Sequence, residues 1–131
     1  MNRAGPNPHP FAAEWEFSQS IVCEGELVFS SGHGGFGADG EVVDRDDFEA
    51  QLRTAYANLA RTLEAAGASL DTVVKMTVYL KRAEDYETFK RVRHETFSPP
   101  YPASTAVLAG FLFDGMLVEM DAVARVGELR A

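Results

Sequence analysis

Two carboxylates share one face of a predicted strand at 116–124, and they are well suited to acid–base chemistry. Side chains alternate between the two faces of a strand, so Glu119 and Asp121 point the same way. Leu117 and Val123 beside them are apolar, and burying an unpaired carboxylate costs several kcal/mol. We therefore expect these acids to be solvated, paired or used in catalysis, with Glu119 as the catalytic candidate and Asp121 in a structural pair.

Ser104 and His33 could also take part in chemistry. With Glu119 they could complete a Ser/His/acid arrangement across a cleft. The residues around Ser104 lack the G-x-S-x-G motif that exposes a catalytic serine in one large class of hydrolases, which disfavours that arrangement. A zinc or iron site needs at least three convergent ligands, and the spacing of His and acidic residues predicts neither a metal nor a cofactor.

Hydrophobic periodicity predicts the elements that position these side chains. Glu24-Gly25-Glu26 is predicted to connect a β-hairpin, while Asp46 and Glu49 resemble the capping box of a helix that stops at Gly67. The predicted elements are strands at 21–23 and 27–31, a helix from 46 to about 66 with an apolar stripe, a strand at 72–80, a helix at about 83–97 with Tyr86, Phe89, Val92 and Phe97 turned inward, and strands at 103–108 and 116–124.

The resulting order is β-β-α-β-α-β-β, which predicts an α+β domain with a mixed sheet and two helices on one face. The length of 131 residues fits a single domain, 1–131, with 1–12 as an extended N-terminal arm. Two helices leave the other face of the sheet open. Since that face also has apolar residues, we expect a second copy of the chain to cover it, with sites at subunit junctions.

The net charge of −8 and the sequence pI near 4.8 disfavour partners with anionic surfaces. Because the basic residues are scattered, neither nucleic acid nor membrane is expected as a partner. The N-terminal residues lack the apolar run of a secretory signal, so a cytoplasmic location is expected.

Several motifs spread over nearly the whole chain resemble the RidA/YjgF family of reactive-intermediate (imine/enamine) deaminases, also described as L-PSP endoribonucleases. They are Phe17-Ser18-Gln19, Val28-Phe29-Ser30-Ser31-Gly32-His33, Asn58-Leu59, Leu63-Glu64-Ala65-Ala66-Gly67, the strand 73–80, Tyr101-Pro102-Ala103 and Leu117-Val118-Glu119-Met120. The resemblance implies a chorismate-mutase-like homotrimer with a cleft between each pair of subunits. It further implies that Glu119 and nearby backbone groups position a water molecule.

Position 104 departs from the pattern of the deaminating members, which have an Arg after the Pro-Ala pair to bind the substrate carboxylate. Ser104 has one short donor and no charge, so the departure predicts a less acidic or neutral substrate. Phe17 stands where a Tyr is usual, His33 where Gln is frequent, and Lys90 where Asn is frequent. Lys90 or protonated His33 could restore the missing positive charge.

These residues favour a RidA-like hydrolase that acts on a small imine, enamine or related metabolite and differs from standard 2-aminoacrylate deaminases. The alternative is a non-catalytic trimer that binds a small metabolite, and the acidic charge makes an endoribonuclease the least favoured reading. Glu119 is the predicted catalytic residue. The predicted substrate-binding residues are Ser104, Ala103, Gly32, Ser31, His33, Phe17, Lys90 and Tyr101.

Overall fold

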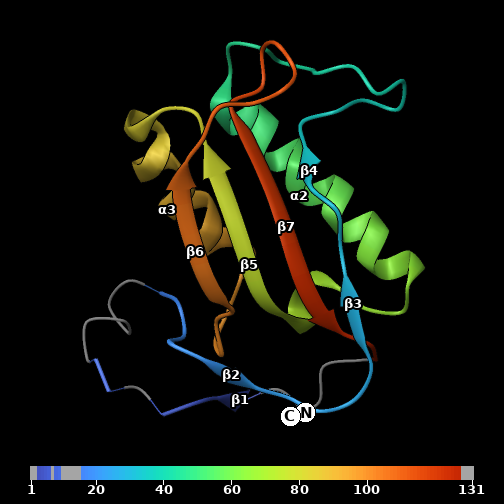
Figure 1. Cartoon of the computed structure of the whole chain (residues 1–131), viewed down its shortest axis with the longest axis vertical. Helices are drawn as coiled ribbons and strands as arrows, with labels where there is room; N and C mark the ends of the chain where they lie inside the picture. Colours follow the sequence, from blue (N-terminus) through green and yellow to red (C-terminus); the bar gives the residue numbers. More distant parts are fainter. Residues whose placement is uncertain (1–2, 7, 10–15, 128–131) are drawn as a thin grey trace.

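A mixed β-sheet packs against two α-helices in the computed structural model, which describes residues 3–6, 8–9 and 16–127 (Figure 1). The elements are β1 (Arg3–Ala4), β2 (Ile21–Val22), β3 (Leu27–Phe29), β4 (His33–Gly34), α2 (Phe48–Ala65), β5 (Val73–Leu80), α3 (Tyr86–Thr96), β6 (Ala103–Leu108) and β7 (Val118–Arg125), with 3-10 turns at Leu70–Thr72 and Ala83–Asp85. The main sheet has the order β3-β7-β5-β6, and β4 also pairs with β7. Strands β5 and β6 run parallel, whereas β7 runs antiparallel to its neighbours.

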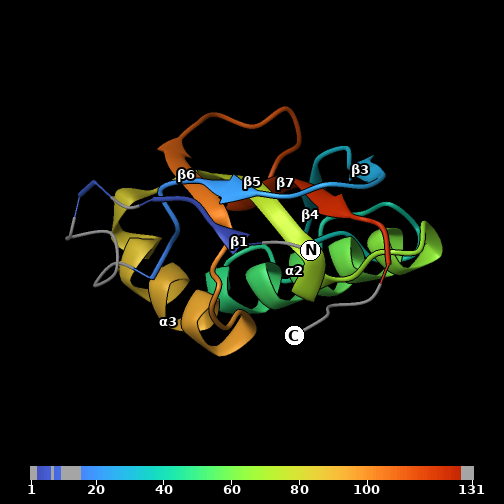
Figure 2. The same cartoon turned by 90° about the horizontal axis from the view of Figure 1, so that it is seen from below.

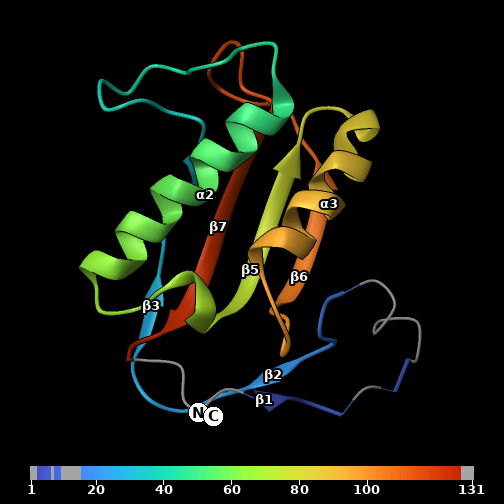
Figure 3. The same ribbon diagram turned by 180° about the vertical axis from the view of Figure 1, so that it is seen from behind.

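Both helices lie on the same face of the sheet (Figures 2 and 3), which confirms the predicted α+β arrangement. The core lies between the two layers, where α2 and α3 bury their apolar side chains against the even-numbered residues of β7 and against Val73, Met76, Val78 and Leu80 of β5. The opposite face of the sheet has no helix over it in the described part of the chain. There Phe29 keeps 73% of its surface exposed.

Helix α2 forms where the apolar spacing predicts it, and Leu52, Ala55 and Leu59 are fully buried. Its N-cap is Asp47, whose side chain accepts a hydrogen bond from the Ala50 amide at 3.0 Å, so the predicted cap at Asp46 is wrong by one residue. The helix ends as predicted, because Gly67 adopts a φ of +84° and the amides of Gly67 and Ala68 bond back to the last turn.

Gln51 is a buried polar residue within the apolar stripe of α2, and the sequence pattern did not identify it. Its side chain is 0% exposed, and Nε2 donates to the carbonyls of Asp44, Arg45 and Gly115. Its Oε1 accepts from the Leu117 amide at 2.9 Å. Gln51 therefore joins the loop before α2 to the segment that leads into β7.

The predicted hairpin between 21–23 and 27–31 is wrong. Strand β2 pairs with β1, whereas β3 pairs with β7, and Gly25 at φ +104° turns the chain between them. By pairing with β7, strand β3 satisfies backbone groups along the edge of that long strand, and in this position Val28 also packs against the core. Of the predicted arm, Arg3–Ala4 forms β1, while 1–2, 7 and 10–12 lie outside the described residues.

Helix α3 buries Phe89, Val92 and Arg93, and Phe97 at its C-cap is buried as well. Tyr86 was expected to turn inward with them, but it is 36% exposed at the first turn. Because the chain forms a 3-10 turn at Ala83–Asp85 before α3 begins, the regular helix starts only at Tyr86, where its outer side remains open to solvent.

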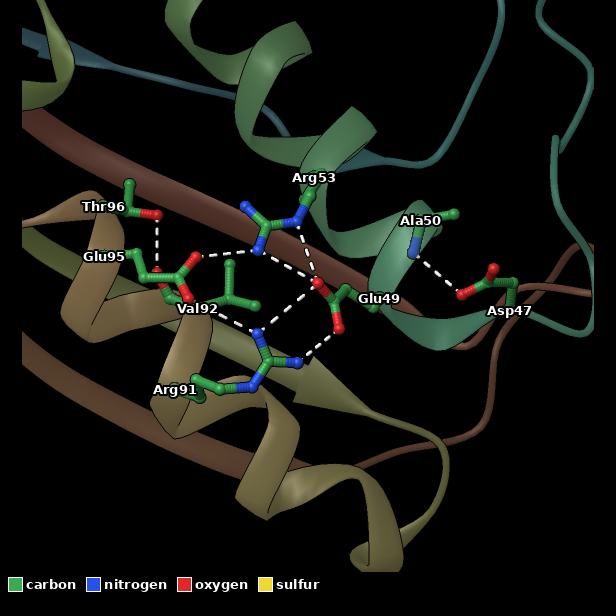
Figure 4. A network of polar contacts seen from close by, with 8 residues as sticks. All are labelled: Asp47, Glu49, Ala50, Arg53, Arg91, Val92, Glu95 and Thr96. Atoms are coloured by element: carbon green, nitrogen blue, oxygen red, sulfur yellow. Dashed lines mark hydrogen bonds and ion pairs between the residues drawn. The ribbon is translucent and has the colours of Figure 1, made fainter.

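Four alternating charges join the two helices, and we call them the α2–α3 network: Glu49, Arg53, Arg91 and Glu95 (Figure 4). Each Arg donates to both Glu residues. These bonds hold the pKa of Glu49 below its usual range, chiefly through Arg91, and that of Glu95 also, chiefly through Arg53. The four side chains are substantially exposed, so the network is expected to stabilise the helix pair only modestly.

Candidate functional site

A pocket of about 410 Å³ opens between the edge strand β6 and helix α3. Most of its lining is apolar and includes Phe17, Leu80, Ala106 and Leu108, while Ser104 and Arg93 supply polar groups. The volume falls in the range of small-molecule sites, and an apolar wall with a few polar groups is their usual composition.

Pairing with β5 turns Ser104 toward this pocket. Ser104 lies opposite Met76 in the parallel β5–β6 register, and Met76 is buried on the helix side of the sheet. Ser18 then brings Phe17 to the same place, because its amide donates to the Pro102 carbonyl and its hydroxyl to the Tyr101 carbonyl. Two segments far apart in the sequence therefore form one wall of the pocket.

Arg93 on α3 forms part of the opposite wall, and it is not among the site residues predicted from the sequence. It is only 6% exposed, and its guanidinium carbon lies 5.2 Å from the centroid of the Phe89 ring. Burial raises the pKa of the nearby Tyr56 phenol, and the positive charge of Arg93 opposes that rise. The spacing held a signal, because residue 93 is four positions after Phe89 and so falls on the inward face of the helix.

The structure brings part of the predicted site together around this pocket. Phe17 and Ser104 line it, and Ala103 is bridged to Ser18 beside it. Tyr101 packs against the core and lines an adjoining hollow with Phe17. Lys90 lies outside this pocket, 3.1 Å from Glu87 and 5.2 Å from the centre of the Tyr86 ring, in a second hollow that Arg93 also lines.

The remaining predicted residues lie toward the other edge of the sheet. Glu119 on β7 is half-buried and points to the face without helices, as its register partner Tyr79 does. Gly32 lies close against it, since a Cβ at Gly32 would stand 2.6 Å from Glu119 Oε1. The backbone at Gly32 and the Glu119 carboxylate therefore form a second cluster, separated from Ser104 by the sheet.

His33 turns away from Glu119 and toward α2. Its Nε2 lies 2.7 Å from Thr62 Oγ1, and its Nδ1 lies 2.8 Å from the carbonyl of Ser31. Within one chain, His33 therefore belongs to a contact between β4 and α2, at the opposite edge of the sheet from Ser104. The Ser/His/acid arrangement considered from the sequence is not assembled within a single chain.

Asp121 forms a pair on the same open face as Glu119. The Tyr79 hydroxyl donates to Asp121 Oδ2 at 3.2 Å, and this bond is the main reason that the pKa of Tyr79 is raised. The geometry fits a structural role for Asp121 and distinguishes it from Glu119.

Comparisons with known proteins show the family of this chain. The family model described as Endoribonuclease L-PSP matches residues 8–126. The chain is 39% identical over 126 residues to the RutC family protein YjgH of Escherichia coli, covering 92% of this chain and 90% of that protein.

The chain belongs to the RidA/YjgF family.

Solved and curated relatives of RidA/YjgF type extend over most of the chain. The crystal structure of RidA from an Antarctic Psychrobacter bacterium matches with a TM-score of 0.71 and 32% identity, covering 95% of this chain and 94% of that one. A bovine protein named 2-iminobutanoate/2-iminopropanoate deaminase is 31% identical over 118 residues, covering 90% of this chain and 85% of that protein.

None of the helices in the described ranges has the length and hydropathy to cross a bilayer. Among the same residues, no three His, Cys, Asp or Glu side chains gather into a group that could hold a metal ion.

Proposed function

We propose that this chain is a RidA-type hydrolase that adds water to a small imine, enamine or related metabolite, in clefts between the subunits of a homotrimer. The observation behind this proposal is that the predicted site residues divide into two clusters, one around Ser104 and one around Glu119. The sheet separates them within one copy, whereas neighbouring copies in a closed ring could bring one cluster against the other. Relatives named as iminobutanoate deaminases support the choice of reaction.

In the proposed reaction the water oxygen bonds to the imine carbon, and a proton passes to the imine nitrogen. The hydroxyl proton of this adduct then passes to the nitrogen, the carbon–nitrogen bond breaks, ammonia leaves and a carbonyl forms. An enamine first takes a proton on carbon and gives one up from nitrogen, which makes it the imine. We assign to Glu119 the orientation of the water and the transfer of its proton, and to the backbone at Gly32 the support of that carboxylate.

A second candidate function is that of a non-catalytic trimer that binds a small metabolite in the same clefts. Ser104 favours it, because a neutral hydroxyl stands where the deaminating members have an Arg. For either candidate we propose a small metabolite and further copies of the chain as the partners, with nucleic acid and membranes excluded. The cytoplasmic location remains a prediction from the sequence.

Hydrolysis of imines generated in situ, with residual imine trapped by semicarbazide, tests the reaction. We expect Glu119→Gln to lose at least about a hundredfold in rate, which is the usual size of a general acid–base contribution. Asp121→Asn is the matched control, because it lies on the same strand and face but is paired with Tyr79. A wild-type chain that hydrolyses no imine, or a Glu119→Gln variant that retains full activity, would contradict the proposal.

Mixing two inactive variants tests whether the site is shared between subunits. Glu119→Gln disables one cluster, and Ala106→Trp fills the pocket from an exposed position on β6. In trimers re-formed from equal amounts of the two variants, about a quarter of the sites should be intact. Each site takes one cluster from each of two neighbouring subunits, and each cluster is intact in about half of the subunits. No recovery in mixed trimers, or a monomer by light scattering, would reject the shared cleft.

A further inference from the structure

The pocket between β6 and α3 has a single charged residue in an otherwise neutral lining. Among its lining residues in the described part of the chain, Arg93 alone has a formal charge. A cation in an apolar, partly enclosed space attracts an anion far more strongly than one in water, because the surrounding dielectric is low. The pocket is therefore suited to an anionic ligand.

The guanidinium of Arg93 is held in place by its surroundings. Arg93 is more than nine-tenths buried, and its charged end lies over the ring of Phe89. Long charged side chains are almost never buried to this extent unless the head group is paired, and Arg93 has a partner of its own within the protein. Five N–H donors in a rigid plane can serve several partners at once, so contacts within the protein leave room for a ligand.

Ser104 presents a second polar group to the same pocket from the opposite wall. Its Oγ is buried, and within residues 3–6, 8–9 and 16–127 it has no hydrogen-bond partner. A buried hydroxyl without a partner costs free energy, and a ligand that fills the pocket can satisfy it. A guanidinium from α3 and a hydroxyl from β6 thus face a common space.

We propose that Arg93 is the anchor of this pocket for the carboxylate of a small, largely apolar ligand, with Ser104 as the second donor. This inference rests on the proposed function in taking the ligand to be its substrate or product. The planar guanidinium of one Arg can donate two parallel hydrogen bonds to one carboxylate, whereas a phosphate dianion would require more positive charge than this pocket contains. This proposal reverses the sequence prediction of a neutral substrate. The positive charge that is absent at position 104 is supplied by Arg93 on α3.

Neither residue proposed from the sequence supplies this charge to the pocket. His33 faces α2 at the other edge of the sheet, and Lys90 is paired with Glu87 in the neighbouring hollow. Arg91, on the same helix as Arg93, is exposed and belongs to the α2–α3 network. It provides a control substitution of equal size and charge outside the pocket.

Binding of three probes to the full chain, by calorimetry without turnover, tests the inference. The probes are butanoate, its neutral near-isostere butanamide, and inorganic phosphate. We expect butanoate to bind at least about tenfold more tightly than the other two. Arg93→Met should weaken butanoate by about ten- to a hundredfold and change butanamide by less than about twofold, since a charge-assisted hydrogen bond is worth that much. Arg93→Lys should retain part of the preference, and Arg91→Met should retain all of it.

If Arg93→Met does not fold, Ala106→Trp tests the same pocket from an exposed position, and it should abolish butanoate binding. The inference is overturned if butanoate does not bind, if butanamide or phosphate binds equally well, if Arg93→Met weakens butanoate and butanamide alike, or if Ala106→Trp leaves binding intact. Its failure is separable from that of the proposed function. Butanoate binding without any imine hydrolysis would reject only the reaction, whereas hydrolysis that favours neutral imines and ignores Arg93→Met would reject only the anchor.

Discussion

Replacing the buried Gln51 by Leu should destabilise the protein strongly for a substitution that leaves side-chain size almost unchanged. The side chain is 0% exposed and makes four hydrogen bonds to backbone groups of two separate loops. Leu is nearly the same size and has a similar helix propensity, so the change removes polar atoms without opening a large cavity. The effect therefore measures the hydrogen bonds.

Two of the four bonds should account for most of the cost. Asp44 and Arg45 are exposed, so water can replace Gln51 at their carbonyls. Leu117 is buried and Gly115 half-buried, and their bonds to Gln51 are both 2.9 Å long. An unsatisfied buried backbone group costs about 1–3 kcal/mol, so we expect a loss of about 3 kcal/mol in the free energy of unfolding. For a chain of this size the midpoint of thermal unfolding should fall by about 10 °C.

Urea unfolding followed by circular dichroism, together with calorimetric melting, measures this loss. Glu64→Leu is the matched control on the exposed side of the same helix, and it should change stability by less than about 0.5 kcal/mol. Gln51→Glu keeps the acceptor for the Leu117 amide but sets a carboxylate against three carbonyls. Relative to wild type, it should be less stable at neutral than at acidic pH. A Gln51→Leu protein as stable as Glu64→Leu would refute the reasoning.

Three further predictions test caps, charges and the Glu119 cluster. Asp47→Ala should lose about 1 kcal/mol of unfolding free energy while Asp46→Ala loses almost none, and equal effects would reject the assigned N-cap. Gly32→Ala should push the Glu119 carboxylate aside, lowering imine hydrolysis about tenfold with little change in the melting temperature; unchanged activity would contradict this. The carboxyl pKa values of the α2–α3 network are lowered by folding, so its contribution is present at neutral pH and lost as pH falls through them. The stability difference between wild type and Arg53→Met in urea should therefore shrink toward acid, and a difference that grows would oppose the sign.

Local sequence signals predicted most of the helices and strands. The spacing of Leu52, Ala55 and Leu59 marks the buried face of α2, and Gly67 marks its end. These signals are reliable because helix periodicity, and a helix end at a glycine in the left-handed conformation, depend on residues only a few positions apart. The false hairpin at 21–31 shows their limit, since strand pairing depends on which distant edge offers the better partner.

The candidate site was predicted residue by residue, but its arrangement was not. Glu119, Ser104 and Phe17 were named from motifs, yet the sequence could not indicate that the sheet separates Glu119 from the other two. His33 could not be excluded from the pocket until its contact with Thr62 was known. Arg93 was overlooked because a charged residue on an inward helical position has no motif to mark it.

The sequence by itself determined the family, the layer of two helices on one sheet and the absence of an Arg at position 104. Only the tertiary structure decided which charge faces the pocket, because parallel pairing of β5 with β6 turns Ser104 toward α3, where Arg93 lies buried. The physical reason is that a side chain's direction depends on strand register and helix packing. Both are set by contacts between residues far apart in the chain.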